Sequence, residues 1–124
     1  EEFRSILEGI AFAERLSYEI LEKAGGPKIK SLNSVGGGTK SQLWSKIRAT
    51  VMNIPVITQE NAGSDLGAAM LALAASKGGS LSENLSQIPL QPGITYEPNI
   101  SEINKLEENY QKFLELIRRF RKDL

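Results

Sequence analysis

The chain has 124 residues, and its 15 basic and 15 acidic side chains give a formal net charge of zero. A chain of this length can bury one small core, and the balanced charge gives no support for a nucleic-acid or membrane-surface partner. The sequence has neither cysteine nor histidine, which excludes a disulfide scaffold, the usual zinc sites and histidine-dependent triads. No apolar run reaches transmembrane length, so we expect a cytoplasmic protein.

Residues 2–24 carry apolar side chains at helical spacing and predict a long helix, which Gly25, Gly26 and Pro27 end. The apolar side chains cover more than a narrow stripe, so we expect burial on more than one side of this helix. The sequence begins with Glu1 inside the helical pattern, without a capping residue ahead of it. We therefore expect a fragment of a longer chain.

Two short apolar segments, 28–35 and 55–58, predict strands, and residues 40–52 predict a helix between them. This order of elements continues with a third helix. It predicts an α-β-α-β-α arrangement with parallel strands and right-handed crossovers, which is typical of α/β proteins. Two short strands make a poor sheet on their own, so we expect further strands upstream.

The third predicted helix, 65–78, is rich in alanine and glycine, and such small residues let a neighbouring element approach closely. Either Ser64 or Asp65 can cap its first turn. Residues 79–100 contain three prolines and little periodicity, so we expect a connecting loop over the surface.

The last predicted helix, 101–123, carries apolar residues that step by three and four. These are Ile103, Leu106, Tyr110, Phe113, Ile117, Phe120 and Leu124. Such a stripe either packs a terminal helix on its own domain or forms a coiled-coil interface with a partner. The sequence leaves both interpretations open.

The segment LNSVGGGTKSQLWSKI, 32–47, places three glycines, 36–38, between a predicted strand and a predicted helix. Glycines permit unusual backbone angles and let a flat ligand or a phosphate approach the main chain, where the amides of a helix N-terminus attract negative charge. The segment is not a P-loop, because Thr39 separates the last glycine from Lys40. It is not a dinucleotide loop, because Ser41 stands where the third glycine is required. The turn therefore predicts either another kind of nucleotide site or a tight turn without a ligand.

No residue pattern predicts a catalytic or metal-binding group. The glutamates of the first helix are typical of a solvated or ion-paired face, and Asp65 is typical of a helix cap.

Four segments resemble the FGGY family of carbohydrate kinases, and they follow that family's order and spacing. They are RSILEGIAFAERLSYEILE (4–22), VGGGTKSQLWSKIRATVMNIPV (35–56), ENAGSDLGAAMLALAASKG (60–78) and ITYEPNISEINKLEENYQKFLELIRRF (94–120). The first three are similar to the family patterns RA-x-LEGIAF, GGGAKSxLWxQIxADxxGxPV and ExxALGAAxLAxxGxG. Together the segments cover nearly the whole chain, with a departure from the usual pattern at 61–65 (NAGSD).

This resemblance implies an ATP-dependent sugar or polyol kinase with two domains of the actin and hexokinase (ribonuclease H-like) type. Residues 1–124 would form the C-terminal portion of the second, nucleotide-binding domain. The glycine turn would bind ATP or ADP. Gly37 and Gly38 match the glycines that pass close to the nucleotide, and Ser41 and Gln42 match the place where a side chain meets the adenine.

The resemblance also implies what this segment does not carry. The family's general base, its phosphate-binding hairpins and its magnesium carboxylate all precede the segment, so magnesium would enter as MgATP in the full-length enzyme and the sugar would bind through the missing domain. We expect the fragment alone to be inactive, and its truncated sheet makes self-association an expected outcome. The alternative is a non-catalytic interaction module built on the C-terminal helix.

Overall fold

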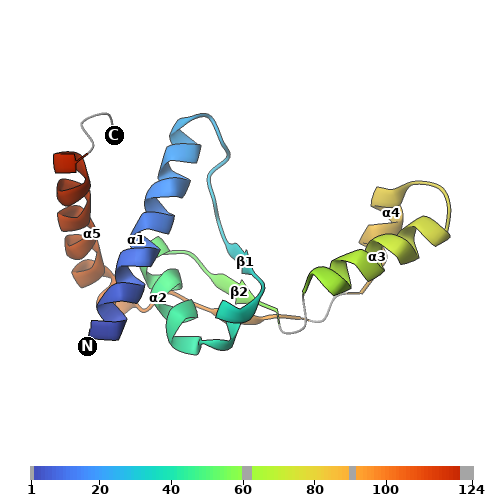
Figure 1. The fold of residues 1–124 in the computed structure, drawn as a ribbon, viewed down its shortest axis with the longest axis horizontal. Coiled ribbons are helices and arrows are strands. Elements are labelled where there is room, and N and C mark those ends of the chain that lie inside the picture. Colours follow the sequence, from blue (N-terminus) through green and yellow to red (C-terminus); the bar gives the residue numbers. More distant parts are fainter. Residues whose placement is uncertain (1, 60–62, 90–91, 121–124) are drawn as a thin grey trace.

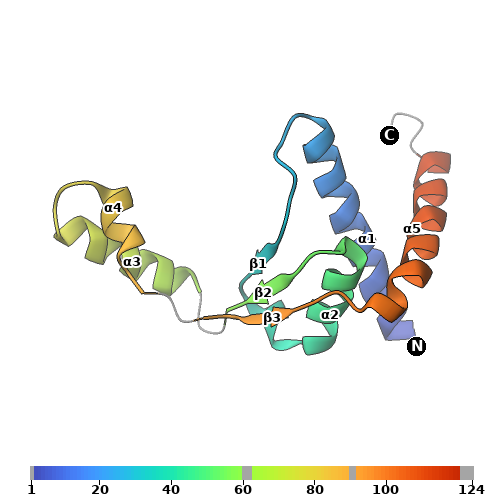
Figure 2. The same cartoon turned by 180° about the vertical axis from the view of Figure 1, so that it is seen from behind.

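The computed structural model of the chain describes residues 2–59, 63–89 and 92–120. Its helices are α1 (Glu2–Lys23), α2 (Gln42–Met52), α3 (Ser64–Ser76), α4 (Leu81–Ser86) and α5 (Ile100–Phe120), with a 3-10 turn, η1, at Gly37–Lys40. Its strands are β1 (Leu32–Ser34), β2 (Val56–Thr58) and β3 (Ile94–Tyr96). The sheet, α1, α2 and α5 form one body, from which α3 and α4 extend as an arm (Figure 1, Figure 2).

The structure confirms the first predicted helix as α1, which ends just before Gly25 and Gly26. Gly25 has a φ of 99°, a left-handed conformation that favours glycine. The amides of Gly25 and Gly26 donate to the carbonyls of Glu22 and Leu21 at 3.1 and 3.0 Å, which satisfies the last turn of α1.

The broad apolar surface of α1 does not correspond to burial on several sides. Ala11 and Phe12 are its buried residues. Large apolar side chains of α1 that remain exposed are Phe3, Ile6, Ile10, Ile20 and Leu21. The expectation of burial on more than one side is therefore wrong for this chain, because α1 packs on α2 and α5 along one face.

The central element is α2, which contributes to two hydrophobic clusters. Ile47 and Val51 are buried with Ala11 and Phe12 of α1 and with residues of α5. From another side of the same helix, Ala49 packs on the sheet. Helix α2 thus holds the sheet against the other two helices (Figure 2).

The apolar stripe of α5 faces its own chain. Leu106 and Tyr110 are buried, and the ring centroid of Tyr110 lies 5.7 Å from that of Phe12. Phe113 packs against the same cluster. This confirms the interpretation of a terminal helix packed on its own domain over 106–113. Phe120 is exposed, and residues 121–124 lie outside the described part of the chain.

The sheet has the order β1-β2-β3, with β1 and β2 parallel as predicted. The third strand is antiparallel to β2 and pairs Tyr96 with Val56, which in turn pairs with Leu32. These three side chains form one row across the sheet, and the row packs on Ala49 of α2. The prediction that 79–100 is a connecting loop is therefore wrong, because the segment contains both β3 and the helix α4.

The arm consists of α3 and α4, held together by Asn84. The Nδ2 atom of Asn84 donates to the carbonyls of Ala74 and Gly78 at 3.0 and 2.7 Å. The start of α3 differs from its prediction, since Gly63 occupies the cap position and no side chain caps the helix. Leucines 66, 71 and 73 of α3 are exposed, so the helix contributes little apolar burial within this chain.

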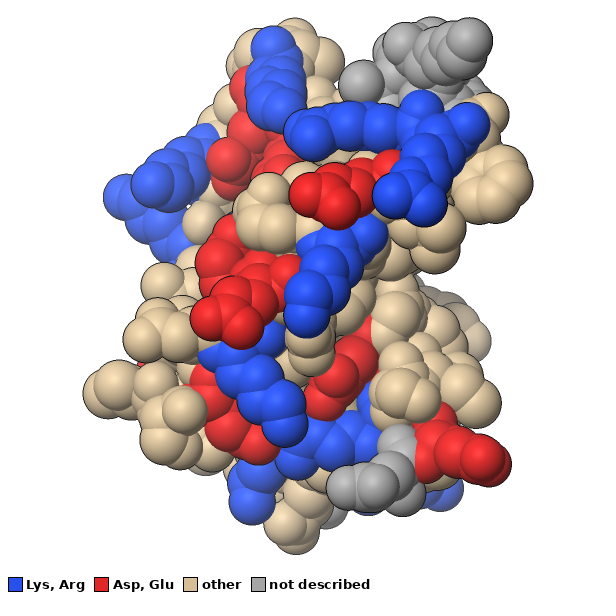
Figure 3. Space-filling model, turned by 90° about the vertical axis from the view of Figure 1, so that its left-hand side faces the viewer, with Lys and Arg blue, Asp and Glu red and all other residues tan. Residues whose placement is uncertain are grey.

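The face on which α5 lies carries basic and acidic side chains interspersed rather than in separate patches (Figure 3). Such mixing prevents a large field of one sign from developing there. The basic residues Arg118 and Arg119 occupy the last turn of α5, where they favour the helix dipole. Within the described ranges, no helix combines the length and apolarity that crossing a membrane requires.

Candidate functional site

The glycine turn lies at the edge of the sheet where both parallel strands end. Strand β1 ends at Ser34 and β2 at Thr58, and these residues are register partners. The amide of Gln59 donates to the carbonyl of Ser34 at 3.2 Å, which holds the two strand ends together. In open α/β sheets, ligands bind outside the carboxyl ends of the strands, so the turn occupies the expected position for a ligand site.

The turn leaves β1 through a glycine with a positive φ and enters α2 through a 3-10 turn. Gly36 has φ 91° and ψ −173°, a combination that is essentially restricted to glycine. The hydroxyl and the amide of Thr39 both donate to the carbonyl of Gly36, at 2.7 and 3.1 Å. Helix α2 begins at Gln42 rather than at the predicted residue 40, because η1 occupies 37–40.

Gly37 and Gly38 present an open surface. A Cβ atom built on Gly37 would meet nothing within 4 Å, and one on Gly38 would contact only the Trp44 ring, at 3.5 Å. Among the described residues, the amides of both glycines lack a backbone hydrogen-bond partner. A flat ligand can therefore approach the main chain here and accept hydrogen bonds from it.

Ser41 and Gln42 differ in how the fold uses them. Ser41 caps α2, since its Oγ accepts a hydrogen bond from the Trp44 amide at 3.2 Å. Its hydroxyl hydrogen is still available for a second partner. Gln42 is exposed at the first position of α2, and its side chain makes no hydrogen bond within the described residues. The structure thus brings all four predicted site residues to one turn.

Beneath the turn lies an ion pair that the sequence did not predict as part of the site. Arg48, only 9% exposed, donates to both carboxylate oxygens of Glu14, at 2.8 and 2.6 Å. Its Nη1 atom also donates to the Oγ of Ser34 at 2.7 Å. Glu14 belongs to the glutamates predicted to be solvated or paired, and here it is paired. An arginine at an inward position of a predicted helix was the one signal that could have indicated this site.

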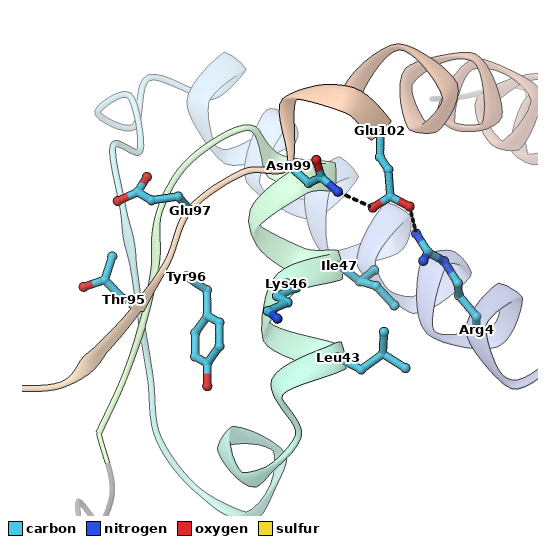
Figure 4. A pocket seen from close by; sticks show the side chains of 9 residues that line it. All are labelled: Arg4, Leu43, Lys46, Ile47, Thr95, Tyr96, Glu97, Asn99 and Glu102. Carbon is cyan, nitrogen blue, oxygen red and sulfur yellow. Dashed lines mark hydrogen bonds and ion pairs between the residues drawn. The ribbon is translucent and has the colours of Figure 1, made fainter.

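A cavity with an apolar wall lies on the other side of α2, between α2 and β3 (Figure 4). Its volume is about 520 Å³, and Leu43, Ile47 and Tyr96 form its apolar wall. At its rim, Glu102 accepts from Arg4 at 2.7 Å and from Asn99 at 3.1 Å. The bond to Glu8, followed by that to Glu102, raises the pKa of Arg4.

The predicted site residues do not line this cavity, and they do not line the cavity beside Tyr18 and Ile54 or the one between Leu16 and Ile117. Among the described residues, the open space beside Gly37 makes the glycine turn an exposed surface. Within the described part of the chain, no group of three or more acidic side chains is arranged to hold a metal ion.

Known proteins are similar to this chain in sequence. Residues 1–76 match the model of the FGGY family of carbohydrate kinases, C-terminal domain. A xylulose kinase of Staphylococcus epidermidis is 30% identical over 122 residues, which cover 98% of this chain and 24% of that protein. An L-fuculokinase of Escherichia coli is 35% identical over 69 residues, which cover 56% of this chain and 15% of that protein.

Solved structures of sugar kinases are also similar to this chain. A "xyloylose kinase" from Brucella ovis superposes with a TM-score of 0.80 at 36% identity, over 93% of this chain and 24% of that chain. A Plasmodium falciparum glycerol kinase, solved with ADP, superposes with a TM-score of 0.68 over 94% of this chain and 23% of that chain; at 21% identity it shows the fold alone. The chain thus spans about a quarter of the length of its xylulose kinase relative.

Proposed function

Since the chain belongs to the FGGY family of carbohydrate kinases, we propose that its glycine turn forms the adenosine side of an ATP site in a sugar or polyol kinase. The fold is the mixed α/β arrangement of that family, here a fragment of an actin/hexokinase-like domain with a long C-terminal helix. In this proposal, residues 1–124 form the C-terminal portion of the nucleotide-binding domain of the enzyme.

The observation that carries the proposal is the open backbone of Gly37 and Gly38 at the carboxyl edge of the parallel strands. Side chains at these two positions would stand where a flat ligand must lie. Gln42 offers a free amide group beside them, with both a donor and an acceptor for an adenine edge. Ser41 supports this arrangement in two ways, by capping α2 and by offering its hydroxyl hydrogen to the ligand.

The proposed reaction transfers the γ-phosphate of ATP to a sugar hydroxyl. Phosphoryl transfer depends on positioning and on stabilisation of the charge on the phosphoryl oxygens. The glycine turn contributes positioning, because it would hold the nucleotide at its adenosine end. Magnesium would arrive as MgATP, and we assign it no ligand in this chain. We expect the chain alone to bind nucleotide and to transfer no phosphate.

The experiment that tests this proposal is a titration of the 15N-labelled chain with ADP, followed by backbone amide shifts. We expect shifts at Gly37, Gly38 and Gln42 and an affinity that falls about tenfold or more in Gly37→Ala, which corresponds to roughly 1.4 kcal/mol. Gly37 is preferred to Gly38 for this substitution, because a Cβ at position 37 meets no protein atom within 4 Å whereas one at position 38 contacts the Trp44 ring at 3.5 Å.

A matched control is Gly9→Ala, which also adds a Cβ into open space, but on α1. This variant should bind ADP like the wild type. Amide signals of the glycine turn that do not move at about 10 mM ADP, a concentration at which even a millimolar site fills, would contradict the proposal.

The alternative function, an interaction module built on α5, depended on the apolar stripe of that helix. This stripe packs on α1 and α2 of the same chain over 106–113, so it is not free for a partner there.

A further inference from the structure

We propose that Arg48 is a positioning residue that braces the glycine turn from beneath, through Ser34 before the turn and Trp44 after it. The role of this brace in ligand affinity rests on the proposed nucleotide site. Its effect on the conformation of the turn does not.

Arg48 itself is held firmly by Glu14. Its guanidinium forms a two-pronged pair with Glu14, in which Nε and Nη2 each donate to one carboxylate oxygen, at 2.8 and 2.6 Å. The Arg48 side chain is 10% exposed and the Glu14 side chain is 23% exposed, so water reaches the pair only in part. A fork-to-fork pair fixes the orientation of the guanidinium plane as well as its position.

Arg48 contacts the chain just before the turn. The remaining nitrogen, Nη1, donates to the Ser34 hydroxyl at 2.7 Å. Ser34 is the last residue of β1 and stands two positions before Gly36, whose positive φ starts the turn. Because the pair with Glu14 fixes Arg48, this bond fixes the point from which the chain leaves the sheet.

Arg48 also contacts Trp44, which follows the turn. The guanidinium carbon of Arg48 lies 5.5 Å from the centroid of the Trp44 ring, within the range of a cation–π interaction. The two residues are four apart on α2 and therefore share a face of the helix. The Trp44 ring in turn lies against Gly38, since a Cβ there would meet its Cδ1 and Nε1 atoms at 3.5 Å.

Arg48 thus contacts both ends of a turn whose outer surface is open. Lysine cannot replace it, because one ammonium group cannot hold both carboxylate oxygens and Ser34 in a plane and also cover the indole. We expect Arg48→Lys to increase the fraction of molecules in which the turn has left its binding conformation. If the competent fraction falls to about a tenth, the apparent dissociation constant rises about tenfold.

The test uses two variants of the chain, Arg48→Lys and Ser34→Ala. The sequence has a single tryptophan, so the emission of Trp44 reports on the turn without labelling. We expect Arg48→Lys to shift this emission, to move the amide signals of 36–38 and to speed their hydrogen exchange, all without nucleotide. Ser34→Ala removes only the bond before the turn, so it should move the glycine signals and leave the emission nearly unchanged. It also keeps the test decisive if Arg48→Lys does not fold.

A matched control is Glu107→Gln, which removes an ion pair with Arg15 between α1 and α5, away from the turn. A loss of affinity for ADP in Arg48→Lys but not in Glu107→Gln would assign the effect to the brace rather than to general destabilisation. Folded Arg48→Lys and Ser34→Ala variants with unchanged glycine signals would overturn the inference. A wild-type chain that binds no ADP would count against the proposed function, whereas altered glycine signals in the variants would still support the brace.

Discussion

The guanidinium carbon of Arg15 lies 4.0 Å from the centroid of the Tyr110 ring, and this contact joins α1 to α5. Glu19 accepts hydrogen bonds from both residues, at 2.9 Å from Arg15 Nε and 2.9 Å from the tyrosine hydroxyl. Arg15 also donates to Glu107 at 2.6 Å and to the carbonyl of Val51 at 3.2 Å. This cluster therefore connects all three helices of the main body at one end of their common core.

We expect Tyr110→Phe to lower the free energy of unfolding by about 1.5 kcal/mol, the lower end for a hydrogen bond to a charged group. The lower end applies because Glu19 is 33% exposed and keeps its bond to Arg15. Urea denaturation at neutral pH measures the change.

The same variant has a second, pH-dependent effect. Burial, followed by the bond to Glu19, raises the pKa of Tyr110 above its ordinary value of 10.0. The wild type should therefore lose stability as the pH rises above about 10, where the unfolded chain ionises first. Tyr110→Phe should lack this part of the alkaline loss, and equal alkaline slopes in both proteins would contradict the described environment of the hydroxyl.

Glu107 supplies the corresponding prediction at acid pH. The hydrogen bond from Arg15 lowers the pKa of Glu107 from its ordinary value of 4.5. A lowered pKa means that the stabilisation is present above pH 4.5 and is lost as the pH falls through the folded-state value. We expect the stability gap between the wild type and Glu107→Gln to narrow below that pH, as measured by urea midpoints along a pH series. A gap that stays constant down to about pH 3 would show that the carboxylate is not selectively stabilised in the folded chain.

The sequence predicted the elements whose pattern is long or whose ends carry strong signals. Helices α1 and α5 span many turns, so their apolar spacing was decisive, and Gly25 marked the end of α1. It did not predict β3 or α4, which are three and six residues long and lie in a segment that combines prolines with little apolar periodicity. The prolines of 79–100 favour a loop, yet none lies inside an element: Pro89 and Pro92 stand between α4 and β3, and Pro98 stands between β3 and α5.

In the candidate site, too, the sequence predicted one part and not another. The glycines and the capping Ser41 are neighbours in sequence, so a local pattern was enough to indicate the turn. The brace beneath it joins Arg48 to Glu14, which is 34 positions away, and to Ser34, which is 14 positions away. Such a pairing depends on how α1 and β1 pack on α2, and a pattern within one segment cannot reveal it.

A leucine-to-alanine substitution should cost much more stability in the buried part of α5 than in the exposed helix α3. Leu106 is 2% exposed in the core of the main body, whereas Leu71 of α3 is 50% exposed. We expect Leu106→Ala to cost about 2–5 kcal/mol, the range for a buried leucine that leaves a cavity. Leu71→Ala should change the stability of the main body by less than about 0.5 kcal/mol. Urea unfolding followed by Trp44 emission reports on the main body, and a large effect of Leu71→Ala would show that α3 packs on it.

Substitutions at Gly36 and Gly37 test two different effects. Alanine at position 36 strains the backbone, whereas alanine at position 37 places a methyl group where the ligand would lie. Gly36 has the glycine-only combination of φ 91° and ψ −173°, so Gly36→Ala should cost about 1–3 kcal/mol. Gly37 has open space at its Cβ position and no left-handed φ, so Gly37→Ala should leave stability unchanged or raise it by about 0.4–1 kcal/mol. Thermal or urea unfolding of the two variants measures the difference, and equal costs at both positions would mean that the turn does not have this conformation. Because Gly37→Ala preserves the fold, a loss of ADP binding in that variant can be assigned to the added methyl group meeting the nucleotide.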